Sequence, residues 1–256
     1  MGVGAHQDDI EFMAFHGIEE CFGQEDQWFT GVTCTNGAGS PRVGIYANYT
    51  DVEMQQVRRQ EQRKAAFIGR YAAMVQLDYA SSVIKNPTDP HLKSDLVEIL
   101  KIAQPKVVYT HNLADKHDTH VAVVVALLLA VRELPRNERP QRVLGCEVWR
   151  DLDWLADKDK VLLNVSRRDS LAAALSGVFD SQISGGKRYD LAVLGRRRAN
   201  ATFFESHGVD VAEQLTFAMD LTPLIVDEQR DLADYVAAHI DQFKTDVIKK
   251  VKARLA

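Results

Sequence analysis

Two short segments of the chain concentrate imidazole and carboxylate side chains. Residues 4–11 read Gly-Ala-His-Gln-Asp-Asp-Ile-Glu, and residues 110–120 contain three histidines and two aspartates. Half of the eight histidines in the chain lie in these segments: His6, His111, His117 and His120. Imidazole and carboxylate groups bind divalent ions such as Zn²⁺ and act as general acids and bases. Together the segments predict a hydrolytic metal site.

Two imidazoles and one carboxylate can hold a divalent ion and leave positions open for water and substrate. His6, Asp9 and His120 can supply this set. Asp8 is adjacent to a ligand but points elsewhere, so it can accept the proton of a metal-bound water. His117 lies three positions before His120 on one helical face, so one ring can ligate while the other faces the reacting carbonyl. Zn²⁺ is the expected cofactor, and the ligand set also suits Fe²⁺.

The elements that must position these segments alternate between strand and helix. The predicted strands are short and end near a turn residue or a polar cluster: Met1–Ala5, Phe29–Cys34, Lys106–Tyr109 and Arg142–Val148. The predicted helices are Asp51–Ile68, Leu92–Ala103 and Thr119–Arg132. This alternation predicts an α/β fold whose mainly parallel sheet is covered by helices on both faces. Ligands of such folds bind at the carboxyl ends of the strands, where both segments fall.

Each segment taken alone also has a structural explanation. A histidine near a strand end is often a hydrogen-bonded structural residue, and Asp8 or Asp9 can cap the helix that follows. The convergence of both segments on one sheet edge favours a site over two unrelated structural roles.

Length and composition predict one domain over residues 1–256. A chain of 256 residues with 46% hydrophobic residues can bury a full core. Its 31 Lys and Arg against 36 Asp and Glu leave a net charge of −5, which disfavours a nucleic-acid partner. The longest apolar run, residues 121–131, is too short to span a bilayer, and the N-terminus does not resemble a signal peptide. We therefore expect a cytoplasmic protein that is not bound to a membrane.

The first segment resembles the AHPDD-x-E motif, and the second the D-x-H-x-D-H motif, of the PIG-L/LmbE-like zinc-dependent N-acetylglucosaminyl deacetylases. Weaker marks agree: a glycine turn at 35–40, the helix pattern Arg58-x-x-Glu61, and a late segment ending in Ser181-Gln182. The resemblance covers roughly the first 180 residues. It implies a Rossmann-like α/β sandwich and the removal of an acetyl group from an N-acetylated amino sugar or its conjugate.

The resemblance also implies roles for individual residues. Zinc would be held by His6, Asp9 and His120. Asp8 would be the general base and later the acid that protonates the leaving amine, and His117 would stabilise the oxyanion. Arg58 would contact the substrate.

The chain departs from the family pattern at two places. Gln7 stands where the family usually has proline, so the backbone between His6 and Asp8 loses a fixed φ angle. Asp118 and Thr119 replace the usual Pro-Asp pair, so Asp115 or Asp118 must orient His117 if that ring is to act as an imidazolium. We expect both aspartates to border the substrate site.

Residues 185–256 match the family least. Their basic run, Arg196–Arg198, is either solvated or directed at a substrate carboxylate or phosphate, and we expect Arg197 to bind substrate. His207 is either a lid residue over the site or an ordinary surface histidine. Three aromatic residues are candidates for a wall that stacks on a sugar, with core packing as the alternative: Trp149, Trp154 and Tyr189.

The last stretch, Asp227 to Leu255, has apolar residues at helical spacing and a lysine-rich end. This pattern predicts an amphipathic terminal helix packed on the core. A membrane-surface or partner-binding helix is the alternative, which the interspersed acidic residues disfavour.

The sequence predicts a metal-dependent deacetylase whose partner is a small N-acetylated sugar. One alternative is a non-catalytic sugar-binding or regulatory protein on the same fold, and another is an amidohydrolase of a different amide. A nucleotide-binding module is disfavoured, because carboxylates stand where a pyrophosphate would sit. The sequence leaves open the identity of the substrate and the oligomeric state; a homo-oligomer is one way to complete the short first strand.

Overall fold

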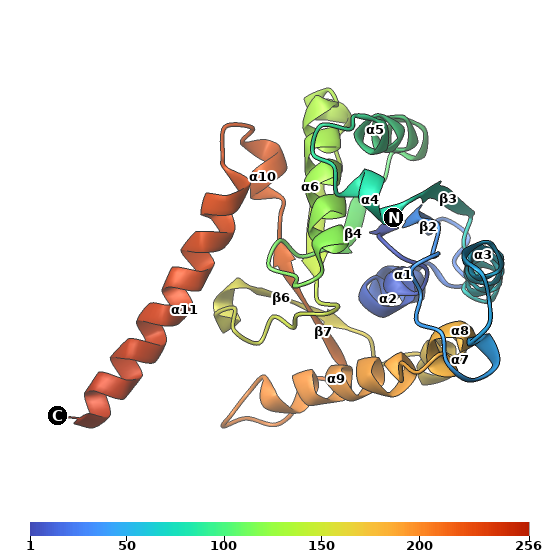
Figure 1. Cartoon of the computed structure of the whole chain (residues 1–256). Coiled ribbons are helices and arrows are strands. Elements are labelled where there is room, and N and C mark those ends of the chain that lie inside the picture. The colour runs from blue at the N-terminus through green and yellow to red at the C-terminus, as the bar shows by residue number, and fades with distance from the viewer. Residues whose placement is uncertain (256) are drawn as a thin grey trace.

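A computed structural model describes residues 1–255 and arranges seven strands in one sheet with helices on both faces (Figure 1). The strands are β1 (Gly2–Gly4), β2 (Thr30–Thr35), β3 (Ala73–Tyr79), β4 (Val107–His111), β5 (Arg142–Cys146), β6 (Lys160–Asn164) and β7 (Leu215–Asp220). Their order across the sheet is β3-β2-β1-β4-β5-β7-β6. The predicted α/β class with a mainly parallel sheet is confirmed.

The sheet is parallel from β3 to β5, whereas β7 pairs antiparallel with both β5 and β6. The four predicted strands are present, with ends shifted by one or two residues. The sequence analysis missed β3, β6 and β7. The side chains of the edge strand β3 are mostly half-buried, and in the edge strand β6 only Leu163 is buried, so neither strand shows a run of buried apolar residues. β7 is buried, but its place between β5 and β6 depends on pairing with distant parts of the chain.

The strand order reverses between β1 and β4. From β1 the chain builds outward through β2 and β3, and it then returns to place β4 and β5 on the other side. At such a reversal the loops after the two central strands diverge and leave a crevice at their carboxyl ends. Both histidine-rich segments follow these two strands, so the topology alone brings them together.

The helices are α1 (Asp9–Met13), α2 (Phe15–Cys21), α3 (Asp51–Ile68), α4 (Ser81–Ile84), α5 (His91–Ala103), α6 (Asp118–Glu133), α7 (Asp169–Gly177), α8 (Asp180–Ile183), α9 (Tyr189–Phe203), α10 (Pro223–Val226) and α11 (Leu232–Leu255). The three helices predicted between strands are present, and α3 has the predicted bounds. Its start is fixed locally, because Thr50 and Glu53 form a reciprocal capping box.

Apolar side chains pack on both faces of the sheet. Neighbouring residues of a strand point to opposite faces, so β4 gives Val108 to one core cluster and Tyr109 to the other. β5 divides Val143 and Leu144 in the same way. Helices α5 and α6 cover the first cluster, and α1, α2 and α7 cover the second. The two layers hold the central strands, and with them the loops that carry the site.

The terminal helix α11 differs from its prediction. It begins at Leu232 rather than near Asp227, because the carboxylate of Asp231 caps it by accepting the N–H groups of Ala233 and Asp234. Only its first part contacts the core, and none of its residues within the described chain is buried. The expectation of a terminal helix packed on the core therefore holds only for its first part.

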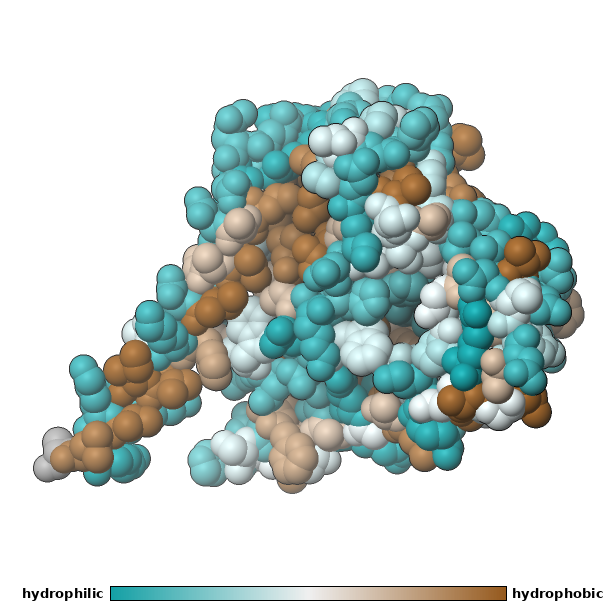
Figure 2. Space-filling model, in the orientation of Figure 1, coloured by the Kyte–Doolittle hydropathy of each residue, from teal (hydrophilic) through white to brown (hydrophobic). Residues whose placement is uncertain are grey.

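The second half of α11 runs away from the body of the molecule (Figure 1), and a hollow lies between it and residues 153–157. Its apolar stripe is exposed and lies along the helix in the space-filling view (Figure 2): Ile240, Phe243, Val247, Ile248, Val251 and Leu255. Among the helices of residues 1–255, none combines the length and the apolar character that a bilayer crossing requires.

Candidate metal centre and active site

The segment after β1 turns sharply before α1. Asp8 has a φ of 96°, in the left-handed region that side chains rarely adopt. Its N–H donates to Oε1 of Gln62 (3.3 Å), and Nε2 of Gln62 donates to Oε1 of Glu11 (2.8 Å). A conformation of this kind costs about 1–3 kcal/mol. The chain of hydrogen bonds from α3 holds Asp8 in it.

Gln7, at the position where the family pattern has proline, anchors the turn through its side chain. Its side chain is fully buried and donates to the carbonyl oxygen of Thr35 at the end of β2 (2.8 Å). The space for it depends on Gly37, which has a φ of 76°. A Cβ at Gly37 would lie 2.7 Å from Oε1 of Gln7 and 2.8 Å from Cβ of Arg58. The turn that carries His6 and Asp8 is thus tied to the neighbouring strand without a proline.

The second segment is organised around the buried carboxylate of Asp115. One oxygen accepts the backbone N–H of His117 (3.0 Å), and the other accepts the backbone N–H of Trp149 (3.1 Å). The second oxygen also lies 3.5 Å from Nδ1 of His120, which is buried in the first turn of α6. Asp115 therefore joins the loops after β4 and β5 and places a carboxylate beside the ring of His120.

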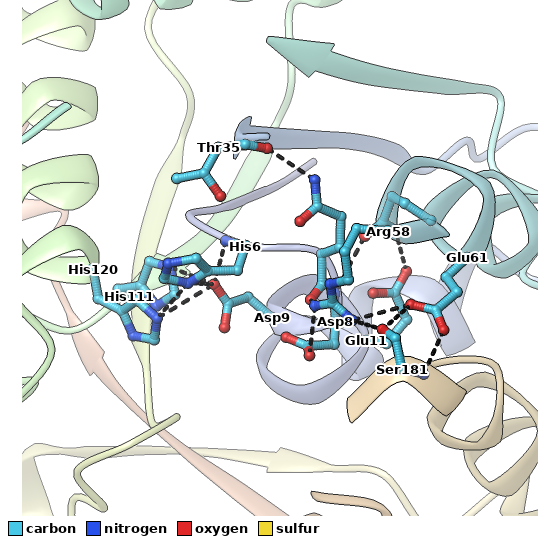
Figure 3. A network of polar contacts seen from close by, with 12 residues as sticks. His6, Asp8, Asp9, Glu11, Thr35, Arg58, Glu61, His111, His120 and Ser181 are labelled. Carbon is cyan, nitrogen blue, oxygen red and sulfur yellow. Dashed lines mark hydrogen bonds and ion pairs between the residues drawn. The ribbon is translucent and has the colours of Figure 1, made fainter. Parts of the chain in front are cut away.

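Three potential ligand atoms converge between the two segments (Figure 3). Nδ1 of His6 lies 3.1 Å from Nε2 of His120 and 3.2 Å from Oδ2 of Asp9, and Nε2 of His120 lies 3.4 Å from the same carboxylate oxygen. Two ligands of a tetrahedral zinc ion, each about 2.0–2.1 Å from the metal, are roughly 3.3 Å apart. The donor set and its spacing fit a divalent ion.

The electrostatics of this cluster favour the ligand protonation states. Burial would raise the pKa of Asp9, but His120 and His111 hold it well below its usual range. The pKa of His120 is lowered to about 4, mainly by burial, although Asp9 pulls it upward. At neutral pH these groups are a carboxylate and a neutral imidazole, the forms that bind a metal.

Two further histidines stand beside this triad. The residues that could hold an ion fall into two groups, His6 with His117 and His120, and Asp9 with His111 and His120. His111 was not assigned a role from the sequence. Its Nε2 accepts the backbone N–H of Ala5 (2.9 Å), so that lone pair joins β1 to β4 and is not free for a metal. Each group shares two members with the triad predicted from the sequence, and neither contains all three.

A buried network surrounds Asp8 (Figure 3). Nη2 of Arg58 donates to Oδ2 of Asp8 (2.9 Å), and Nη1 donates to Glu61 and to Ser181 (3.2 Å each). Ser181 in turn donates its N–H and its hydroxyl to Glu61 (2.7 and 2.6 Å). Burial raises the pKa of Asp8 to about 7, with Arg58 opposing this effect. The resemblance implied that Arg58 contacts substrate. In the structure its guanidinium is buried, and its Nη1 and Nη2 donate to the side chains of Asp8, Glu61 and Ser181.

The ring of His117 faces the cavity and stacks on His120, with 4.5 Å between the ring centres. Burial, and then His6, lower its pKa, so the neutral imidazole is favoured. Its Nδ1 has no hydrogen-bond partner within residues 1–255. Asp115 contacts the backbone of His117 and the ring of His120, and Asp118 is exposed. The described chain thus does not bear out the expectation that either aspartate orients the His117 ring.

These residues lie in a cavity of about 590 Å³. His6, Asp8, Asp9 and His117 line it, and His120 lies beneath His117. Of the three aromatic candidates, Trp149 and Tyr189 line the cavity, whereas Trp154 lies in a separate hollow beside α11. The cavity can take a ligand the size of a sugar or a small conjugate.

Arg197 does not take the predicted position. It is buried, and Nη2 donates to the carbonyl oxygens of Glu11 (3.0 Å) and Phe12 (2.9 Å), which the short helix α1 leaves without helical partners. Its neighbour Arg196 lines the cavity instead. Asp118, Asp115 and His207 are not among the described residues that line the cavity.

A family model described as PIG-L, GlcNAc-PI de-N-acetylase, matches residues 1–131, which contain both segments of the site. No curated protein matches the sequence.

Solved structures share the fold at low sequence identity. GalB, the 4-carboxy-2-hydroxymuconate hydratase of Pseudomonas putida KT2440, is 16% identical with a TM-score of 0.63, over 86% of this chain and 94% of that one. The N,N'-diacetylchitobiose deacetylase of Pyrococcus horikoshii is 15% identical with a TM-score of 0.60, over 84% and 82%. The zinc-inhibited form of teicoplanin deacetylase Orf2 is 15% identical with a TM-score of 0.59, over 85% and 96%. Because a hydratase and two deacetylases share the fold, it does not by itself fix the reaction.

Proposed function

The chain belongs to the PIG-L family, and from that premise we propose that it is a metal-dependent hydrolase that removes the acetyl group from an N-acetylated amino sugar or its conjugate. One observation carries the proposal. Three ligand atoms from two distant segments converge within 3.4 Å of one another beside a cavity that Asp8 also lines.

The residues that would hold the metal are His6, Asp9 and His120. Zn²⁺ there would supply a Lewis acid for the amide carbonyl and lower the pKa of a water molecule. The carboxylate of Asp115 lies 3.5 Å from Nδ1 of His120, on the side of the ring where the outer partner of a ligating histidine commonly stands.

Asp8 would take the proton of the attacking water and deliver it to the leaving amine. Its carboxylate lines the cavity, and Arg58 fixes one of its oxygens. Arg58 acts in this proposal as a positioning residue, because its donors hold the carboxylate in one orientation and tie it to Glu61 and Ser181.

His117 would donate an N–H group to the oxygen of the tetrahedral intermediate. A neutral imidazole can do this from one nitrogen, so the lowered pKa of His117 is compatible with the role. Trp149 and Tyr189 offer flat apolar surfaces beside this ring, and such surfaces stack well on a sugar.

A protein that binds sugar without turnover was the main alternative. This alternative is based on two departures from the family pattern. Gln7 replaces a proline, and the carboxylate that would orient His117 stands at a different position. The bond from Gln7 to Thr35 weakens the first ground. The second ground stands, because within the described chain Asp115 contacts the backbone of His117 and Nδ1 of its ring has no hydrogen-bond partner.

The test is acetate release from a panel of N-acetylated amino sugars by zinc-loaded protein, beside chelated protein and the variants His120→Ala and Asp8→Asn. We expect release by the loaded wild type alone, with Asp8→Asn still binding metal. Metal at one ion per chain without any acetate release would favour the binding protein. Release from other amides but from no sugar would favour an amidohydrolase of a different class.

A further inference from the structure

The exposed half of α11, residues 240–255, carries an apolar stripe that its own molecule leaves in contact with solvent. The stripe consists of side chains whose exposed fractions run from 40% to 81%: Ile240, Phe243, Val247, Ile248, Val251 and Leu255. It runs along the helix in Figure 2. Adjacent exposed apolar side chains mark an interaction site, because burying them is favourable.

Most of this stripe faces away from the body of the molecule. A hollow of about 780 Å³ lies between α11 and residues 153–157, and Thr245 and Lys249 are among the helix residues that line it. Val247 and Val251 of the stripe each come two positions after one of these residues. Two positions correspond to a turn of about 200° around a helix, so this part of the stripe lies opposite the hollow. A second molecule is therefore needed to cover it.

The charge of the exposed half of α11 is opposite to that of the rest of the chain. Residues 240–255 contain five Lys and Arg and two Asp, a net charge of +3, whereas the whole chain carries −5. The remainder therefore carries −8. This distribution favours a second copy of the chain as the partner, because its acidic body attracts the cationic helix. An anionic lipid surface attracts the helix but repels the larger acidic body.

The hollow offers an acidic and apolar surface to such a helix. On the side of the body it is lined by Trp154 and Ala156, which are half-buried, and by the exposed carboxylates of Asp153 and Asp157. Both carboxylates share Lys160, whose Nζ lies 2.8 Å from Asp157 and 3.8 Å from Asp153. One lysine between two carboxylates leaves a net negative charge beside the indole.

The helix side of the hollow adds no net charge. Its charged residues balance, two against two: Asp241 and Asp246, Lys249 and Lys250. Ala238 and Thr245 are the small residues on this side. Small side chains let a second helix approach closely, since the distance between two helix axes depends on the side chains at the contact.

The exposed half of α11 has the features that this surface requires. Lys252 lies four positions after Ile248, and Arg254 lies three positions after Val251, so both cations border the apolar stripe. An apolar stripe bordered by cations is complementary to an indole bordered by carboxylates.

We propose that two copies of this chain form a dimer by exchanging the exposed half of α11. The apolar stripe of each copy packs on Trp154 of the other, and Lys252 and Arg254 face the carboxylates of the hollow. A two-fold axis lets each copy supply one helix and receive one, so the assembly closes at two copies. The inference is independent of the proposed function, because these residues are separate from those that line the catalytic cavity.

The first test is the oligomeric state of the full chain, measured by sedimentation equilibrium over concentrations up to about 100 μM. We expect a dimer for the wild type. Val247→Glu combined with Val251→Glu should weaken the dimer by about tenfold or more, because each copy would then bury unpaired carboxylates. Both side chains are exposed in the single molecule, so the variant should fold, and thermal melts check this. The matched control is Ile102→Glu, at an exposed apolar position of α5, which should dimerise like the wild type.

A charge exchange tests the pairing of helix and hollow. Asp153→Lys with Asp157→Lys should weaken self-association by about tenfold or more, and so should Lys252→Asp with Arg254→Asp, because each variant places like charges at both contacts. An equimolar mixture of the two double variants should restore the dimer, since each helix then meets opposite charge on the other body. No recovery in the mixture would overturn the proposed arrangement.

Two further outcomes would overturn the dimer itself. One is a wild type that stays monomeric over the whole concentration range, and the other is a Val247→Glu, Val251→Glu variant that dimerises as tightly as the wild type. Vesicles containing phosphatidylserine identify the alternative partner. A monomeric wild type that sediments with these vesicles, and a double variant that does not, would assign the stripe to a lipid surface.

Discussion

The guanidinium of Arg58, in the middle of α3, lies 2.9 Å from the carboxylate of Asp8, which follows β1. The same guanidinium binds Glu61 and Ser181, so the orientation of the proposed base depends on residues from two separate elements, α3 and α8. The arginine fork makes these contacts simultaneously, and a lysine cannot.

Arg58→Lys should lower kcat for acetate release by roughly 10–100-fold, because the carboxylate of Asp8 loses its fixed orientation. Metal content should stay at the wild-type level, since none of the three ligands contacts Arg58. Steady-state kinetics and metal analysis check this. Arg59→Lys, whose side chain pairs with Asp78 on the surface, is the control. Wild-type kcat in Arg58→Lys would contradict the positioning role.

Asp115→Asn should weaken metal binding by roughly 10–100-fold, because His120 loses the carboxylate beside its Nδ1. Asp118→Asn should have no such effect, since Asp118 is exposed at the start of α6. Competition with a chromogenic chelator measures both affinities. Similar losses in the two variants would argue against an orienting role specific to Asp115.

Gly37→Ala should destabilise the fold by about 1–3 kcal/mol and lower activity, because a Cβ there meets Gln7 and Arg58 at a positive φ. Gly39→Ala is the matched control from the same loop, since a Cβ at Gly39 meets nothing within 4 Å in the described chain. Urea unfolding gives both free energies. Equal stabilities for the two variants would show that the loop adapts at Gly37.

Arg197→Ala should destabilise the protein by about 3 kcal/mol, because two carbonyl groups at α1 lose their donor and a buried volume is emptied. Arg198→Ala, which removes an exposed partner of Asp169, should change stability by less than about 1 kcal/mol. Denaturant midpoints and slopes distinguish the two. A substrate-binding Arg197 would instead show an increased KM with little loss of stability.

The buried carboxyl of Glu147 predicts a pH dependence of stability. Burial raises its pKa above 4.5, so between 4.5 and the folded value the folded state binds more protons than the unfolded state. Stability from this group therefore falls as pH rises through that window, by up to about 1.4 kcal/mol for each pH unit. Above the folded pKa this contribution is constant.

Urea unfolding of wild type and Glu147→Gln at several pH values above 4.5 measures this slope. The variant should be less stable at the acidic end, because the amide cannot accept the N–H of Leu152 as Oε2 does, but its profile should be flatter. Glu205→Gln, at an exposed position, should follow the wild-type slope. Parallel profiles for wild type and Glu147→Gln would refute the prediction.

Features set by neighbouring residues were predictable from the sequence. The helix Asp51–Ile68 was predicted with its observed bounds because its cap and its glycine stop are local. The proposed ligands were predicted as a set because the two segments that carry them follow the central strands β1 and β4. Strands β3 and β6 were missed because each buries at most one side chain fully, so neither has a distinctive apolar pattern.

Features set by long-range contacts could not be predicted. The pairing of Glu61 with Ser181 joins residues 120 positions apart. Arg196 and Arg197 differ by one position in a helix, and a turn of roughly 100° decides which one faces the cavity. The sequence marks the basic run, but only the packing of α9 fixes its rotation.

The two histidines of the proposed triad are separated by 114 positions in the chain. An ion held by both would act as a cross-link that closes a loop of that length, and it would constrain the unfolded chain only while bound. Metal affinity and the free energy of unfolding would then be linked, because release of the ion would remove a constraint between the loops after β1 and β4. The ion would stabilise the folded sheet as well as take part in catalysis.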